Sequence, residues 1–421
     1  MVIRARPTRR LNEYKSDVMR IVLCHSHYQQ PGGEDAVFAD ESALLTAYGH
    51  EVIPYTLHND VIQSMNRWQV ARSTLWNQKV HDELLSLLRR ERPAVMHCTN
   101  TFPLISPAAY YAAQTSGVAV VQSLHNYRLL CANGLFLRGG HVCEDCLGRR
   151  IGWPGMLHAC YRESRSASAV VATLQTAHWA MGTWKRMVDA YIVLTDFARK
   201  KFIAGGLPAS RLHVKPNFVH PDPGPGGGTG KYAIYVGRLS QEKGIETLLA
   251  AWQQSPPSLR LKIVGDGPLK QRVREAAALS PCIEWLGHVP RATVQQLIAD
   301  ATMLVLPSNC YEGFPKTILE AFAVGTPVVT SRIGGMAEIV AQGRTGCMVR
   351  PGSASALAQA VSELAADPAR LSAMRREARL DFETHYTADV NHRRLVEIYA
   401  HALRSRGTEV AAENAVTLVG T

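Results

Sequence analysis

Residues 302–325 read TMLVLPSNCYEGFPKTILEAFAVG, a stretch that passes from an apolar run through a polar loop into a helical pattern. The apolar run at 302–306 is short and is closed by a Pro-Ser pair, which is typical of a buried strand that ends in a loop. Pro315 suits the first position of a helix, because its φ is already helical and its missing N–H would otherwise be an unpaired donor. The helix is expected to run to about Val324 and to stop at Gly325, which tolerates a left-handed C-cap.

Two carboxylates lie on this strand-to-helix junction, Glu312 in the loop and Glu320 inside the helix. The backbone amides of Gly313, Phe314 and Lys316 are predicted to face a phosphate, because a helix N-terminus carries unpaired donors and the positive end of the dipole. Carboxylates beside such a phosphate site suit the binding of sugar hydroxyls, which points to a nucleotide-sugar enzyme. The alternative is a surface loop with two ordinary solvated glutamates.

Two further turns of the same kind support the nucleotide-sugar interpretation. The apolar run at 232–236 leads into GRLSQEKG at residues 237–244, and another short apolar strand leads into GDGP at residues 265–268. Arg238 and Lys243 flank the first of these turns, where a guanidinium fork and an ammonium group can neutralise a diphosphate leaving group. Each turn alone is a weak signal, but the three together, in this order, are specific.

With these motifs the chain resembles the retaining glycosyltransferases of family four, the glycosyl transferases group 1. The resemblance covers about residues 18–403 and rests on the motifs above together with Gly334-Gly335 and Glu338. It implies an α/β protein of GT-B architecture, in which two facing Rossmann-like domains with parallel sheets enclose a cleft. The alternation of short apolar strands with helical patterns along this chain also favours parallel sheets.

The resemblance also implies an activity and a set of site residues. The activity is transfer of a sugar from a nucleoside-diphosphate sugar, of UDP or GDP type, to a glycan, lipid-linked or natural-product acceptor with retention of anomeric configuration. Arg238 and Lys243 would hold the diphosphate, Glu312 the transferred sugar and Glu320 the ribose, and His125 completes the catalytic candidates. The donor-binding candidates are Gly32, Gly33, Asn217, Gly237, Gly265, Asp266, Val289, Gly313, Phe314, Pro315, Lys316 and Glu320.

Two of these candidate regions lie in the first domain, just after predicted strands. Gly32 and Gly33 open a helix, and their small size would let the backbone approach a ligand closely; a plain tight turn is the alternative. His125 follows the apolar run at 118–123 and matches a histidine that lines the donor-sugar site of the family, although an isolated histidine is more often structural. Asn217 is followed by Phe-Val-His, where the family has Gly-Val-Asp, so the chain departs from the family pattern at this point.

The domain organisation follows from composition and from the same resemblance. The segment PDPGPGGGTG at 221–230 holds no regular pattern and is predicted to be the interdomain linker. The full division is a disordered basic arm at 1–17, an acceptor-side domain at 18–220 with a Cys-rich insertion at 131–160, the linker, a nucleotide-sugar-binding domain at 231–385, a helix at 386–404 that crosses back to the first domain, and a mobile tail at 405–421.

Nine cysteines without a predicted secretory signal suggest a reducing compartment rather than a disulfide framework. Four of them, Cys131, Cys143, Cys146 and Cys160, fall in the glycine-rich insertion, and the middle two form a CxxC knuckle. This grouping makes a candidate structural zinc site, with free thiols as the alternative. The insertion follows His125 and is expected to border the acceptor side of the cleft.

The net charge of +11 fits anionic partners such as nucleotide sugars, lipid diphosphates or a membrane surface. No nucleic-acid motif accompanies the charge, so no nucleic acid is expected as a partner. The sequence has no apolar run long enough to span a bilayer, and we expect a cytoplasmic protein with peripheral contact at the inner face of the membrane.

No two aspartates are separated by a single residue, so an Asp-x-Asp metal clamp for the donor is absent from the sequence. We therefore expect catalysis without a divalent cation, with charge neutralised by Arg238, Lys243 and helix amides. Alanine at Glu312 or Lys243 is expected to remove most turnover while leaving the chain folded. No carboxylate can be assigned as a nucleophile.

Two other functions remain open from the sequence. An epimerase or oxidoreductase acting on nucleotide sugars should carry Gly-x-Gly-x-x-Gly after the first strand, which Pro31-Gly32-Gly33 does not supply. A noncatalytic nucleotide-sugar-binding or scaffold protein would not need Arg238, Lys243, Glu312 and Glu320 together.

Overall fold

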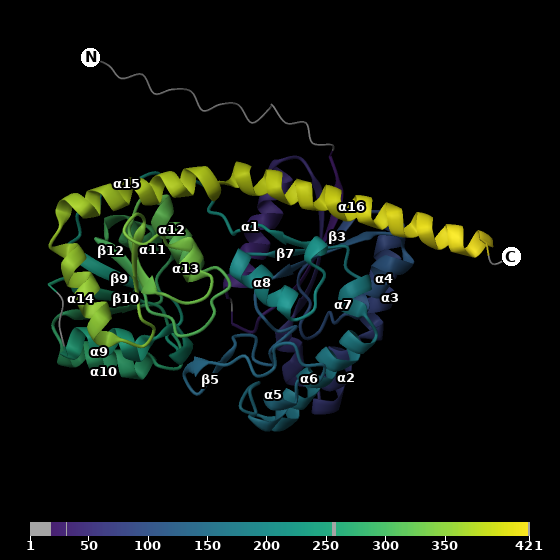
Figure 1. The fold of residues 1–421 in the computed structure, drawn as a ribbon, viewed down its shortest axis with the longest axis horizontal. Helices are drawn as coiled ribbons and strands as arrows, with labels where there is room; N and C mark the ends of the chain where they lie inside the picture. Colours follow the sequence, from purple (N-terminus) through teal and green to yellow (C-terminus); the bar gives the residue numbers. More distant parts are fainter. Residues whose placement is uncertain (1–17, 31, 255–257, 420–421) are drawn as a thin grey trace, which may run out of the picture.

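The computed structural model describes residues 18–30, 32–254 and 258–419, and side chains up to residue 407. Two α/β domains lie side by side, each built on its own six-stranded sheet (Figure 1). This architecture confirms the predicted fold class. The expected basic arm at residues 1–17 lies outside the described residues.

The N-terminal sheet has the strand order β2-β1-β3-β4-β7-β8, and every described pairing within it is parallel. Pro54 is tolerated in β2 because this strand is at the edge of the sheet, where one side of the backbone needs no partner. The strands are β1 (Arg20–His27), β2 (Glu51–His58), β3 (Val95–Asn100), β4 (Ala119–Leu124), β7 (Ala190–Val193) and β8 (Leu212–Val214).

Helices connect these strands and cover the sheet, as βαβ units require. Their bounds are α1 (Gly33–Ala47), α2 (Arg67–Leu75), α3 (Gln78–Glu91), α4 (Ala108–Thr115), α5 (Trp153–Leu157), α6 (Arg165–Ala180), α7 (Thr183–Arg186) and α8 (Asp196–Ala204), with 3₁₀ turns η1 (Asn59–Ser64) and η2 (Ala209–Arg211). Between β4 and α5 the chain forms only a small antiparallel hairpin, β5 (Leu137–Arg138) and β6 (His141–Val142). This hairpin belongs to the Cys-rich insertion.

The C-terminal sheet is also parallel, in the order β11-β10-β9-β12-β13-β14. Its strands are β9 (Tyr232–Val236), β10 (Arg260–Val264), β11 (Ile283–Gly287), β12 (Met303–Leu306), β13 (Val328–Ser331) and β14 (Gly346–Val349). The helical elements are η3 (Gln241–Lys243), α9 (Ile245–Gln254), α10 (Lys270–Leu279), α11 (Arg291–Asp300), α12 (Lys316–Ala323), α13 (Met336–Ile339), α14 (Ala354–Ala365) and α15 (Pro368–His385).

Each sheet is buried on both faces, which explains why its strands read as continuous apolar runs rather than as alternating patterns. All four residues of β12 are buried, and so are all four of β13. Because parallel strands share one direction, their carboxyl ends lie at one edge of each sheet, and the connecting loops at that edge are the expected ligand-binding positions.

The glycine-rich linker is tied to the C-terminal domain. Asp222 accepts two hydrogen bonds from the Arg379 guanidinium at 2.7 and 2.6 Å, and the Gly226 amide donates to the Val324 carbonyl. Residues 215–231 form neither helix nor strand. The linker therefore has a defined path over the α12 and α15 side of the second domain.

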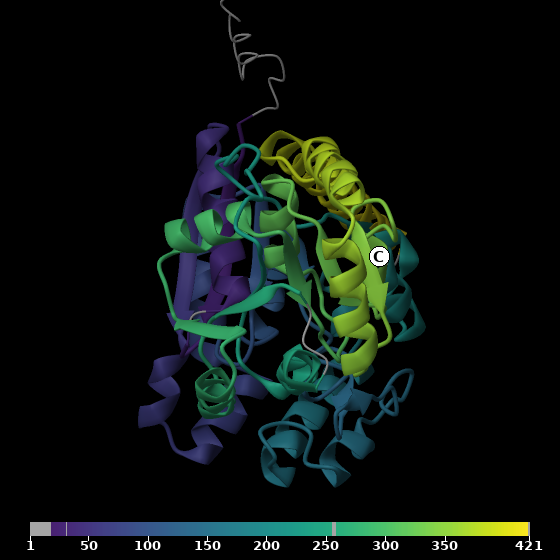
Figure 2. The same ribbon diagram turned by 90° about the vertical axis from the view of Figure 1, so that its left-hand side faces the viewer.

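Helix α16 (Ala388–Val419) runs from the end of α15 across to the N-terminal domain, along the top of Figure 1 and again at the upper edge of Figure 2. Leu395, Ile398, Tyr399 and Ala402 pack into the core beneath β4 and β7. The helix continues to Val419, so the expected end at residue 404 and the separate tail at 405–421 were wrong. The residues beyond 404 are rich in Ala and Glu, which are strong helix formers. Nowhere among the described residues is a helix both long and apolar enough to cross a membrane.

One contact under α16 predicts how stability depends on pH. His97 on β3 is fully buried, its Nδ1 bonded to the Tyr399 hydroxyl and its Nε2 to the Ser123 hydroxyl, each at 2.8 Å. Burial lowers the pKa of His97 to about 4. Between about pH 6.5 and pH 4 the unfolded chain binds a proton here that the folded chain does not, so stability falls as the pH falls through this window, by up to about 3 kcal/mol for this residue.

The measurement is urea unfolding at pH 7.5 and at pH 5.0. His97→Gln should reduce the acid-induced loss, whereas His288→Gln, at an exposed position, should leave it unchanged. An equal acid-induced loss of unfolding free energy in the wild-type protein and in His97→Gln would contradict the assignment of this loss to His97.

Candidate active site

The loop between β12 and α12 carries the motif that the sequence analysis started from. Pro315 is the N-cap residue of α12, because its ψ of 114° is extended. The helix therefore begins at Lys316, one residue later than expected. The helix ends at Ala323, and Gly325 follows with a φ of +72°, as the C-cap prediction required. The amides that precede and begin α12 are therefore available at its N-terminus.

An ion pair joins the first two motifs. The Lys243 ammonium donates to Oε1 of Glu312 at 2.7 Å, and the Ser308 hydroxyl donates to the same oxygen at 2.8 Å. Burial by itself lowers the pKa of Lys243, but the Glu312 carboxylate outweighs burial, and the pKa is raised. Lys243 therefore stays charged at neutral pH, and it is held in place rather than free to move.

Close backbone contacts shape the turns beside this pair. Gly265 has a φ of +137°, and a Cβ on it would lie 1.9 Å from the Gly237 carbonyl oxygen, so only glycine fits. Arg238 is exposed, and its guanidinium makes no hydrogen bond or ion pair with any residue in the described part of the chain. Asp266 is used locally, where it accepts from the Gly267 amide at 2.6 Å and pairs with Lys270 at 3.7 Å. Val289 is half-buried against the core of the second domain.

Glu320 and Lys316 face the first domain. The Glu320 carboxyl is half-buried, and burial raises its pKa. The Lys316 ammonium forms an ion pair with Asp40 on α1, and Arg291 pairs with the same carboxylate at 3.6 Å. Asp40 was not predicted as a site residue, because a lone aspartate within a helix has no motif around it.

The two domains touch directly at Gly313. A Cβ on Gly313 would lie 2.5 Å from the His125 carbonyl oxygen, so the approach requires glycine. His125 lies at the end of β4, and burial lowers its pKa; its buried Nε2 has no hydrogen-bond partner in the described structure. Asn217 donates to the Phe314 carbonyl at 3.2 Å, so it supports the loop even without the glycine and aspartate of the family pattern.

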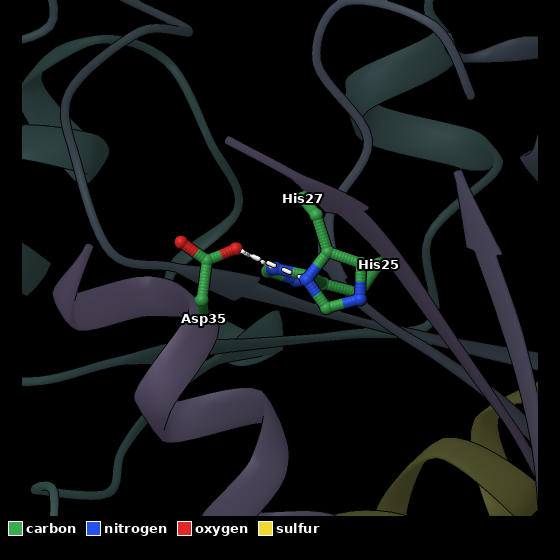
Figure 3. A group of neighbouring side chains, drawn as sticks. All are labelled: His25, His27 and Asp35. Atoms are coloured by element: carbon green, nitrogen blue, oxygen red, sulfur yellow. Dashed lines mark hydrogen bonds and ion pairs between the residues drawn. The ribbon is translucent and has the colours of Figure 1, made fainter. Parts of the chain in front are cut away.

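Gly32 and Gly33 begin α1 beside a cluster of three polar side chains that the sequence analysis missed. Figure 3 shows His25 and His27 from β1 turned toward Asp35 on α1, with ring nitrogens 3.0 and 3.2 Å from one Asp35 oxygen. The Gly32 amide donates to the other oxygen at 2.7 Å. Burial raises the pKa of Asp35, but the hydrogen bonds from His25 and the backbone outweigh burial, and the pKa is lowered.

The ligand-type atoms of His25, His27 and Asp35 lie within 4.8 Å of one another, which is close enough to consider a metal. However, one Asp35 oxygen already accepts from both histidines and from the Tyr28 amide. The arrangement anchors the turn at Gly32. A sequence signal existed in the His-x-His spacing eight to ten residues before an aspartate, but that pattern is common by chance.

A cavity opens next to His125 at the carboxyl ends of β3 and β4. It contains about 630 Å³ of atom-free space, part of it open to solvent. Glu34 reaches its wall, where one carboxylate oxygen accepts from Asn126 at 2.8 Å and the other from the Tyr28 hydroxyl at 2.8 Å. Arg128 stacks over the Phe102 ring on the same wall, with its guanidinium carbon 4.5 Å from the ring centroid.

The structure brings the four cysteines of the insertion around a second, smaller cavity. Cys131 is buried and the other three are half-buried. No three of the sulfur atoms lie within 4.8 Å of one another in the part of the chain that the structure describes. The insertion contacts the second domain at the loop before α12, as described below.

Two facing parallel α/β domains with strand-end loops meeting between them define the GT-B class of fold. Family models agree with this: residues 32–217 match the glycosyl transferase 4-like domain, and residues 230–367 match the glycosyl transferases group 1 model. The chain belongs to the glycosyl transferases group 1 family.

Relatives with curated names match parts of the chain. An exopolysaccharide phosphotransferase of Streptomyces coelicolor is 32% identical over 52% of this chain and 24% of its own length. A glycogen synthase of Mycobacterium tuberculosis is 36% identical over 37% of this chain and 40% of its own length. The amylovoran biosynthesis glycosyltransferase AmsK of Erwinia amylovora is 28% identical over 47% of this chain and 53% of its own length. The matches span between about a quarter and about half of the length of these relatives.

Solved structures share the fold over nearly the whole chain. Anabaena HepE, crystallised with UDP and glucose, superposes with a TM-score of 0.63 at 17% identity, over 89% of this chain and 98% of that one. Sucrose-phosphate synthase of Thermosynechococcus elongatus gives a TM-score of 0.65 at 18% identity, over 94% and 100%.

Proposed function

We propose that this protein transfers a sugar from a nucleoside-diphosphate sugar to a glycan or lipid-linked acceptor, with retention of anomeric configuration. The observation that carries the proposal is the meeting of three groups at one domain interface: the Lys243–Glu312 pair, the helix start after Gly313, and His125 across from it. A cation, helix amides and a carboxylate at one site suit a diphosphate attached to a sugar.

In the proposed reaction the Arg238 guanidinium, Lys243 and the α12 amides hold the diphosphate and stabilise the charge that develops as it leaves. Arg238 suits this role because it is exposed and its guanidinium makes no hydrogen bond or ion pair with any described residue. Glu312 and His125 position the sugar through its hydroxyls, and Glu320 binds the ribose. The transition state is oxocarbenium-like, and the acceptor attacks from the face that the diphosphate vacates.

The donor is proposed to be a UDP- or GDP-sugar, and the presence of UDP and glucose in HepE supports the UDP type. A polysaccharide or lipid-linked acceptor is favoured by the amylovoran and exopolysaccharide names among the relatives, with a natural product as the second choice. The cavity beside His125 is the proposed acceptor site. We place the enzyme in the cytoplasm, and the charge of +11 supports its contact with an anionic membrane surface, where lipid-linked acceptors reside.

The test is release of nucleoside diphosphate from a panel of UDP-, GDP- and ADP-sugars, with binding measured in parallel by thermal shift. Turnover of one donor, with a product whose anomeric configuration by NMR matches that of the donor, is the expected result. Binding without release would favour a noncatalytic sugar-nucleotide-binding protein. A product with inverted configuration would contradict retention.

The same assay tests the expectation that catalysis needs no divalent cation. Because the sequence has no Asp-x-Asp clamp, Arg238 and Lys243 are proposed to supply the positive charge that a bound metal ion supplies in enzymes with such a clamp. Turnover should change by less than about twofold when EDTA replaces Mg²⁺, since fixed cations already stabilise the leaving group. Loss of activity in EDTA that Mg²⁺ or Mn²⁺ restores would contradict this.

A further inference from the structure

Four cysteines from three separate segments of the insertion line one cavity. Cys131 precedes the β5–β6 hairpin, Cys143 and Cys146 form the knuckle after it, and Cys160 follows α5. The proposed transfer reaction uses none of these thiols. The other five cysteines lie elsewhere in the chain, and none of them lines this cavity.

The insertion has little hydrophobic core to hold it in shape. Its only strands are two residues long, and Ile151, Trp153 and Leu157 are exposed by 47–54%. Phe136 and Ala159 in the insertion, and Arg162 and Glu163 just after it, also adopt positive φ, a conformation that needs support from surrounding structure in a non-glycine residue. A segment of this kind is typically fixed by a cross-link or a metal.

The backbone around Cys131 is arranged to support a metal-bound thiolate. The amides of Asn133 and Phe136 lie near its sulfur, and the Gly155 amide lies near the sulfur of Cys146. The Gly134 amide donates to the Cys131 carbonyl and the Leu135 amide to Oδ1 of Asn133, which shapes the loop around Cys131. N–H groups that surround the sulfur atoms of a metal site orient the ligands and stabilise their negative charge. A small hydrophobic cysteine would need no such set of donors.

We propose that Cys131, Cys143, Cys146 and Cys160 bind one structural Zn²⁺ ion. Four thiolates are the ligand set of a closed tetrahedral zinc site, and soft sulfur ligands favour zinc over magnesium or calcium. The four side chains already line one cavity, and binding of one ion requires their sulfur atoms to lie closer together than they do in this structure.

The metal would also fix a contact with the donor loop. Glu144, between the two knuckle cysteines, accepts from the Lys201 ammonium at 2.5 Å and from the Tyr311 hydroxyl. Tyr311 is the residue before Glu312. In the turn of the β5–β6 hairpin, Gly140 lies against the side chain of Gln241, two residues before Lys243. The insertion therefore braces both halves of the ion pair from the opposite domain.

Elemental analysis of the purified full chain tests the metal directly. We expect about one zinc per chain, the stoichiometry of a four-ligand site. Cys143→Ser together with Cys146→Ser should remove it, whereas Cys282→Ser, a half-buried cysteine outside the cluster, should retain it. A chelator should lower the melting temperature of the wild-type protein, and zinc should restore it. Wild-type protein that neither contains zinc nor takes it up on titration would overturn the proposal. Purified protein that contains iron and sulfide instead of zinc would overturn it as well.

The bracing role rests on the proposed function and has a separate readout. Glu144→Gln should keep its zinc but lower kcat about tenfold, because a displaced catalytic loop loses alignment. Glu163→Gln, at an exposed glutamate three residues after the insertion, should leave both unchanged. Full activity in Glu144→Gln would refute the brace. An inactive wild-type protein that still binds zinc would count against the transfer reaction and leave the metal site supported.

Discussion

Replacing Lys243 by alanine should lower kcat at least about 100-fold, the usual scale for removing a group that stabilises developing charge. The ammonium is the only cation bonded to Glu312 among the described residues, and it lies beside the α12 start where the diphosphate is proposed to bind. Its loss removes charge from the leaving group and also frees the Glu312 side chain. Glu312→Ala should have an effect of similar size, because the two groups act as one unit.

Both variants should remain folded, since the two side chains are partly exposed, by 25% for Lys243 and 11% for Glu312. Steady-state nucleoside diphosphate release measures the effect, and circular dichroism melting checks the fold. Lys79→Ala, a surface lysine on α3 that pairs with Glu83, is the matched control and should keep full activity. A Lys243→Ala enzyme within about tenfold of wild type would place the diphosphate elsewhere, because a lost oxyanion-type contact costs more than that.

The fold could be predicted because the local signals agree with one another. The apolar run at 302–306, the helix start near Pro315 and the helix end near Gly325 all predict the same strand-to-helix junction. The structure places β12 and α12 there. Parallel sheets follow from repeated short apolar strands separated by helices. The helix α16 extends beyond the expected end at residue 404, and the Ala and Glu residues in that stretch are strong helix formers.

Sequence motifs nominate the residues of the candidate site, but they do not predict which of these residues pair with one another. Lys243 and Glu312 were both chosen from motifs, yet the bond between them joins positions 69 apart, and spacing does not specify such a contact. Asp40, which pairs with Lys316 from the other domain, has no motif because it is an ordinary helical aspartate until the domains meet. Long-range charge pairs depend on the tertiary fold, and a single sequence does not record them.

A further long-range pair gives the largest expected effect on stability. Lys215 follows β8, and its ammonium donates to Glu41 on α1 at 2.6 Å and to Asn391 on α16 at 3.1 Å. Both charged side chains are 1% exposed. Burial raises the pKa of Glu41, but Lys215 outweighs burial and the pKa is lowered, so the carboxylate stays ionised. The pair joins three elements at the point where the chain leaves the first domain.

Lys215→Met should lower the free energy of unfolding by about 3–5 kcal/mol, because it leaves the Glu41 carboxylate buried without a counter-charge. Urea unfolding followed by circular dichroism measures this. Adding Glu41→Leu to the same chain should recover most of the loss, since the methionine and leucine side chains replace both charges at similar volume. Lys200→Met breaks a pair of nearly equal length, 2.7 Å to Asp196, at an exposed site, and should change stability little. If the double variant were no more stable than Lys215→Met, the loss would come from packing of the lysine stem and the Asn391 contact rather than from an unpaired buried charge.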